Sequence, residues 1–232
     1  MGLQHGQGRA TRATLETLID RSLQYSARPE FSLFLSETAA DVLLLQGDPP
    51  GHISAVDAAW LVAKLSQGGG LCCPAQFEML KRLFAQARSV PQVLTAFAIR
   101  EIEMAILTGR REIIGGVGHE PAVVTHNDVE ALRALSFASA ESSLPHVDRG
   151  TVEALFDIAH ATGSARNDPE FADFFALVIH NHLGACENAD WILAHLARGG
   201  PLTPAEARLL TLLKVEPAPG RAKPRAPFVE AA

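Results

Sequence analysis

A short apolar segment that recurs along the chain constrains the fold more than any single motif does. Residues 29–35 read Pro-Glu-Phe-Ser-Leu-Phe-Leu, residues 169–175 read Pro-Glu-Phe-Ala-Asp-Phe-Phe, and residues 91–97 are a weaker copy. Each copy follows an apolar stretch with a glutamate near its start. These glutamates are Glu16, Glu78 and Glu153. Self-similarity of this kind is typical of repeat proteins, in which one unit cannot bury its apolar face alone.

The remainder of the unit repeats as well. Trp60 and Trp191 each precede a Gly-Gly pair and a leucine, and the interval from tryptophan to leucine is the same in both places. We therefore predict a helical repeat domain over residues 14–214, packed either as one array or as a compact bundle. It is expected to hold about three tandem units. The units are placed near residues 14–76, 77–150 and 151–214.

Composition and helix punctuation both favour an all-α fold. Hydrophobic residues make up 47% of the chain but aromatic residues only 6%, and the apolar content is mostly Leu and Ala, which are strong helix formers. Thr203 and Glu206 match a capping box with Pro204 at the first helical position. The apolar residues from Phe171 to Leu183 recur with helical spacing. The units are therefore expected to be built from helices.

The scarce aromatic residues fall at recurring positions of the units. Phe34 and Phe174 occupy the same place in their copies, and so do Trp60 and Trp191. We expect these side chains to serve the packing of the repeat, which leaves few aromatic residues to mark a ligand site.

Charge and apolar runs argue against two classes of protein. The chain has 232 residues and a formal net charge of -6, whereas a general nucleic-acid binder needs a basic surface. No apolar run approaches the roughly 20 residues that a bilayer-spanning helix needs, so no membrane insertion is expected. The cysteines are odd in number and two of them, Cys72 and Cys73, are adjacent. This usage favours a reducing compartment, and we expect the protein in the cytoplasm.

Both ends of the chain are expected to lie outside the helical domain. Residues 1–13 are polar and contain no apolar segment of the kind found in secretory signals. Residues 215–232 contain four prolines and three basic side chains, a composition typical of a disordered terminus. We therefore predict disorder at both ends.

Two windows resemble the twelve-residue calcium loop of an EF-hand. In residues 46–57, Gly51 falls at the sharp-turn position, Ile53 at the apolar position that pairs with a partner loop, and Asp57 at the closing acid. Residues 195–206 match the same three positions. The matching residues there are Gly200, Leu202 and Glu206. The pattern is also similar to that of the small helical domains of bacterial tellurite-resistance proteins, and it implies short EF-hand-like turns between helices.

The ligand positions of these windows are poorly filled. An EF-hand loop needs oxygen ligands at its first, third and fifth positions, and in the first window these are Gln46, Asp48 and Pro50. A calcium ion takes about six to eight oxygen ligands. We therefore expect structural turns that bind no calcium, in which a C-cap glycine is followed by an N-capped helix.

Three further groups of residues carry candidate chemistry, and for each we prefer a structural interpretation. His182 and Cys186 are spaced to share one metal ion on a helix, but two ligands do not complete a zinc site. Cys72 lies where a helix should begin, a place that can lower the pKa of a thiol, and it also suits a cap position. Residues 115–119 are glycine-rich but lack the preceding strand and the Lys-Ser/Thr pair of a phosphate-binding loop.

We predict a non-catalytic helical adaptor or scaffold of bacterial type that uses grooves between helices to hold a protein partner. The repeated apolar framework comes with no convergent set of polar residues, and repeat arrays make extended binding surfaces. No catalytic residue and no cofactor are expected, and self-association stays open. The alternative is a sensor of a metal ion or small ligand related to a calcium-binding helical fold. Its weak candidate acids are Asp48, Asp57, Asp128 and Glu206.

Overall fold

The computed structural model describes residues 9–114, 120–136, 147–185, 190–197 and 201–214. Within these ranges the chain forms α-helices, joined by a π-helical turn and a 3-10 turn, and no β-strand, so the predicted all-α fold is confirmed. Of the tails expected to be disordered, residues 1–8 and 215–232 lie outside the described residues, whereas residues 9–13 are described and Arg12 and Ala13 belong to the first helix. In chain order the helices and turns are α1 (Arg12–Tyr25), α2 (Pro29–Ala40), η1 (Asp41–Leu45), α3 (Ala55–Ser66), α4 (Pro74–Gln86), α5 (Gln92–Thr108), η2 (Arg111–Ile114), α6 (His126–Ser136), α7 (Arg149–Ala161), α8 (Pro169–Ala185), α9 (Asp190–Ala197) and α10 (Pro204–Leu213).

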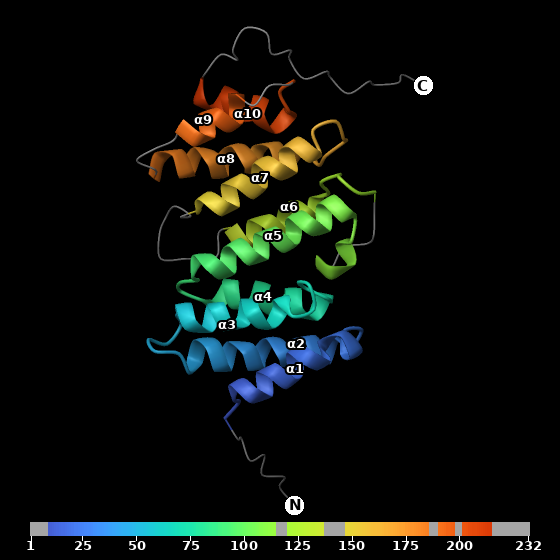
Figure 1. Cartoon of the computed structure of the whole chain (residues 1–232), viewed down its shortest axis with the longest axis vertical. Coiled ribbons are helices and arrows are strands. Elements are labelled where there is room, and N and C mark those ends of the chain that lie inside the picture. The colour runs from blue at the N-terminus through green and yellow to red at the C-terminus, as the bar shows by residue number, and fades with distance from the viewer. Residues whose placement is uncertain (1–8, 115–119, 137–146, 186–189, 198–200, 215–232) are drawn as a thin grey trace, which may run out of the picture.

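The helices are stacked in layers along the long axis of the molecule (Figure 1). Helices α1 and α2 lie at one end of the stack and α9 and α10 at the other. Of the two packings that the repeat allowed, the array is therefore the one observed. No helix among the described residues is long and apolar enough to cross a membrane.

The same helix pairing recurs along the stack. Helix α2 packs most extensively against α4, α5 against α7, and α8 against α10, so each meets the helix two places further along the chain. In addition, α3 packs against α5 and α6 against α8. Both α2 and α8 begin at the repeated prolines, Pro29 and Pro169. The number of units, about three, stays a prediction.

Helix α1 begins at Arg12, two residues before the predicted start of the domain. The side chain of Thr11 accepts a hydrogen bond from the backbone N–H of Thr14 and caps the helix. The Arg12 guanidinium lies 4.7 Å from the centroid of the Trp60 ring, and the indole N–H of Trp60 donates to Glu16 Oε1 at 3.0 Å. These contacts attach α3 to the first turns of α1.

The second repeated tryptophan is held by a matching arginine. Arg149, the first residue of α7, lies 4.8 Å from the centroid of the Trp191 ring. Its Nε donates to Glu153 Oε1 at 2.7 Å, and Glu153 is the counterpart of Glu16. A cation above an indole ring is worth roughly 0.5–1 kcal/mol at a partly exposed site. Trp60 therefore attaches α3 to α1, and Trp191 attaches α9 to α7. Both contacts agree with the packing role expected for the tryptophans.

The two repeated phenylalanines differ in burial, and here one sequence expectation was wrong. Phe174 on α8 is 2% exposed, whereas Phe34 at the matching place on α2 is 53% exposed. Helix α6 packs against α8, and Arg133 Nη2 lies 3.4 Å from Glu170 Oε2, one turn before Phe174. Because α2 is the second helix of the stack, no helix of the α6 kind precedes it among the described residues. Phe34 therefore stays uncovered.

The matched pair of phenylalanines gives the first prediction. Phe174→Ala should lower the free energy of unfolding by about 3–5 kcal/mol, because it leaves a cavity in the core. Phe34→Ala should change it by less than about 0.5 kcal/mol, because an exposed ring loses little packing. Equilibrium unfolding in urea measures both values, and equal losses for the two variants would contradict the difference in burial.

Candidate functional site

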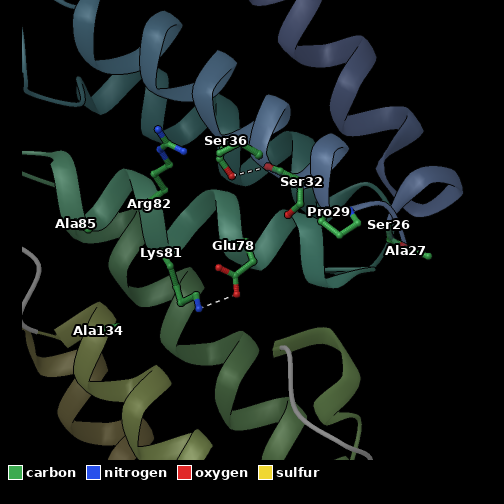
Figure 2. A pocket seen from close by; sticks show the side chains of 11 residues that line it. Ser26, Ala27, Pro29, Ser32, Ser36, Glu78, Lys81, Arg82, Ala85 and Ala134 are labelled. Atoms are coloured by element: carbon green, nitrogen blue, oxygen red, sulfur yellow. Dashed lines mark hydrogen bonds and ion pairs between the residues drawn. The ribbon is translucent and has the colours of Figure 1, made fainter.

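A groove lies between α2 and α4, close to α6 (Figure 2). It has a volume of about 780 Å³ and is open to solvent along its length. The lining residues come from the α1–α2 turn, from one side of α2 and α4, and from a single alanine of α6. They are Ser26, Ala27, Pro29, Ser32, Leu33, Ser36, Glu78, Lys81, Arg82, Ala85 and Ala134. We refer to this feature as the α2–α4 groove.

Small side chains make the groove hollow. Helix α2 and helix α4 each begin with a proline at the first helical position, which sets where their faces start. Ser32 and Ser36 on α2 and Ala85 on α4 are small residues of the lining, beside the longer side chains of Glu78, Lys81 and Arg82 on α4. Leu33 is the one large apolar residue in the lining, and it is 52% exposed.

The charged residues of the groove are paired with one another. Lys81 Nζ lies 2.7 Å from Glu78 Oε1, as drawn in Figure 2, and Arg82 Nη2 lies 3.6 Å from Glu37 Oε1 on α2. All four side chains are about one-third exposed or more. Exposed ion pairs contribute only about 0–1 kcal/mol. Such pairs can exchange partners at little cost, so the groove offers both signs of charge to a ligand.

The lining residues provide no nucleophile with a base beside it. Ser36 donates its hydroxyl proton to the backbone carbonyl of Ser32 at 2.8 Å, and Ser26 donates to the carbonyl of Leu23 at 3.1 Å. Among the described residues that line the groove there is no histidine, cysteine or aspartate. The lining thus offers one large apolar side chain, several small side chains and charged groups that are held in ion pairs.

The candidate acids of the EF-hand-like loops lie elsewhere. Asp57 lies in the first turn of α3, where its Oδ2 accepts a hydrogen bond from the hydroxyl group of Ser54 at 2.7 Å. Its carboxylate also forms an ion pair with Arg12 of α1. Asp48 is exposed in the loop before α3. One acid is thus bound to a cation of the protein and the other faces solvent.

The other two candidate acids are buried at helix starts. Asp128 Oδ2 accepts from Arg111 Nε at 2.9 Å, and both side chains are almost fully buried. Glu206 Oε2 accepts from the backbone N–H of Thr203 at 2.8 Å, and its Oε1 lies 3.2 Å from His160 Nε2. The capping box predicted for α10 is confirmed. The four acids do not converge, and no group of three or more metal-binding side chains occurs among the described residues.

The first EF-hand-like loop pairs with the segment that follows α4. Gly51 has a φ of 87°, the left-handed conformation expected at a sharp turn. The N–H of Ile53 donates to the carbonyl of Ser89 at 3.3 Å, and the N–H of Arg88 donates to the carbonyl of Gly51 at 2.8 Å. In the second EF-hand-like window, His195 belongs to α9 and stacks on Phe156. Residues 198–200 of that window lie outside the described ranges.

The remaining sequence candidates are placed as follows. Cys73, rather than Cys72, is the N-cap residue of α4. Burial raises the pKa of the Cys72 thiol, and the adjacent Cys73 raises it further, so the protonated thiol is favoured. His182 is buried and its Nδ1 lies 2.6 Å from the carbonyl of Val147. Cys186 and residues 115–119 lie outside the described residues.

Helix α5 carries two carboxyls two residues apart, of which Glu101 is partly buried and Glu103 is buried. Glu101 Oε2 accepts from the backbone N–H of Leu71 at 2.8 Å, whereas Glu103 Oε2 accepts from Arg100 Nη1 at 2.8 Å. Burial raises the pKa of both groups, and the carboxylate of Asp157 raises that of Glu103 further. The two carboxyls have separate partners and do not form an acid–base couple. Their spacing in sequence already indicated this divergence.

Comparisons with protein-family models, with curated proteins and with solved structures gave no match for this chain. The function is therefore argued from the geometry of the groove and from the packing of the array.

The raised pKa of Glu103 predicts a specific pH dependence of stability. As pH rises above about 4.5, the carboxyl ionises in the unfolded chain while the folded chain still holds its proton. The folded state then binds more protons, so the free energy of unfolding falls with rising pH until the folded pKa is passed. Glu103→Gln removes this fall and should stabilise the protein more at pH 7 than at pH 4.

Thermal or urea unfolding of both proteins across this pH range measures the effect. The exposed Glu112 supplies a matched control, Glu112→Gln, which should follow the wild-type profile. A Glu103→Gln variant whose stability stays parallel to wild type between pH 4 and pH 7 would refute the assignment.

Proposed function

We propose that the protein is a non-catalytic adaptor that holds a segment of another protein in the α2–α4 groove. The observation that carries the proposal is the open groove with Leu33 half exposed among small side chains. Protein interfaces combine an apolar centre that excludes water with a polar rim. Leu33 supplies the apolar centre here, and the ion pairs of Lys81 and Arg82 supply the rim.

A protein partner suits this groove better than a small molecule or a nucleic acid. Small-molecule sites enclose most of the ligand surface, whereas this groove is open to solvent. A nucleic acid needs unpaired cations, and the two cations of the groove are each paired with a glutamate. We place the protein in the cytoplasm on the ground of its cysteine usage, and treat it as a unit that works without a cofactor.

Site-specific photo-crosslinking tests the proposal. A photo-reactive amino acid replaces Leu33 in the full chain, and the same residue replaces Val56 on α3 as a control that is more exposed but does not line the groove. In a lysate of the source organism, the probe at position 33 should form an adduct with a defined protein and the probe at 56 should not. Lys81→Glu should lower the yield, since it replaces a rim cation by an anion.

Two outcomes would contradict the groove as the binding site. One is the same adduct from both probe positions, and the other is an adduct at 33 that Lys81→Glu and Ala85→Arg leave unchanged. Ala85→Arg fills the groove with a large side chain at a lining position, so it tests steric access independently of charge.

The second candidate function is a calcium-type sensor, and its support is the turn geometry of the first EF-hand-like loop at Gly51. A site of this kind would bind calcium with a Kd of about 10⁻⁹–10⁻³ M and would raise the melting temperature on saturation. Because Asp57 is paired with Arg12, we expect no rise when calcium is added to about 1 mM to metal-free protein. A rise that Asp57→Asn abolishes would favour the sensor over the adaptor.

A further inference from the structure

The exposed Phe34 belongs to a continuous face at the first end of the array. Glu30 and Phe34 are one turn apart on α2, so their side chains lie on the same side of the helix. Glu30 is exposed, Phe34 is 53% exposed and Phe31 is half-buried. Glu30 has no ion-pair partner among the residues that the structure describes. We call these three residues the Phe34 face.

On α8 the two matching phenylalanines are buried. Glu170 and Phe174 are the counterparts of Glu30 and Phe34, and Phe171 is the counterpart of Phe31. Phe171 and Phe174 are each 2% exposed. Helix α6 packs against α8, with Arg133 directed at Glu170. Helix α3 packs in the same way against α5. Of the three corresponding helices, α2 alone has no such neighbour among the described residues.

We propose that the Phe34 face binds an amphipathic helix of a partner protein, which lies on α2 as α6 lies on α8. The helix has an apolar side that covers Phe31 and Phe34, and it carries an arginine or lysine opposite Glu30. The face is distinct from the α2–α4 groove, because none of its residues lines that groove. The inference therefore does not depend on what the groove holds.

Charge and packing both specify this occupant. Glu30 is exposed and can form an ion pair with a cation of the partner, as Glu170 does with Arg133. Helix α6 shows an amphipathic surface of this kind, since Val129, Leu132 and Leu135 are each at most 1% exposed. The side chains of Glu130 and Arg133, by contrast, are 52% and 42% exposed. A helix that is apolar on one side and basic at its edge matches both requirements.

The test uses a peptide of residues 124–136 of this chain as the probe, because it contains the helix that covers α8. A covalent staple joins positions 126 and 130, which are exposed on α6 and one turn apart. The staple compensates for the low helicity of short peptides. Fluorescence anisotropy of the labelled peptide with the full chain should give saturable binding below about 1 mM. Phe34→Ser should weaken it at least about tenfold.

A charge exchange identifies the register of the bound helix. Glu30→Arg should weaken binding of the native peptide roughly three- to fivefold, the range of an exposed ion pair. A peptide with Arg133→Glu should bind the Glu30→Arg protein better than it binds wild type. Circular dichroism and thermal melting verify that both protein variants fold, and Leu193→Ser on α9 is the matched control, since it removes an equally exposed side chain at the other end.

Three results would overturn the proposal. They are absence of saturable binding to the folded wild-type chain, binding that Phe34→Ser leaves unchanged, and failure of the charge exchange to restore affinity. A fourth concerns the occupant. If the full chain forms dimers by light scattering and Phe34→Ser makes it monomeric, a second copy of the chain covers the face instead of a partner helix.

Discussion

The burial of one helix by the helix two places further along the chain holds the whole array together. Helices α2, α5 and α8 carry the apolar stripes, and each is covered by α4, α7 or α10. Burying apolar area is worth roughly 25 cal/mol per Å², and these three contacts are the most extensive between helices of the described residues. The tryptophan–arginine contacts at Trp60 and Trp191 add smaller and local terms. Stability in such a stack is a sum over neighbouring layers.

A stack of this kind has ends that differ chemically from its middle. An inner helix such as α8 packs against α6, α7 and α10, whereas among the described residues no counterpart of α6 packs against α2. The consequence is visible at the repeated phenylalanine, which is buried on α8 and exposed on α2. The α2–α4 groove opens on another side of the same helix. Both candidate binding surfaces therefore involve α2.

Local features of the fold could be predicted from the sequence, and contacts between distant helices could not. Prolines 29 and 169 and the capping box at Thr203 identified helix starts, because these signals act within one turn. The stacking of Arg12 on Trp60 joins residues far apart in sequence and has no local signature. The same reason explains the error at Phe34, since the repeat gives the position of a side chain but not whether a neighbouring helix exists to cover it.

The central claim is that the Phe34 face is open in the isolated chain and covered when a partner binds. Residue-resolved carbene footprinting with mass spectrometry measures this directly by comparing Phe34 with Phe174. The account predicts strong labelling of Phe34 in the purified monomer, loss of that labelling in a lysate of the source organism, and protection of Phe174 in both. Equal protection of the two rings in the purified monomer would contradict the account, and so would labelling of Phe34 that the lysate leaves unchanged.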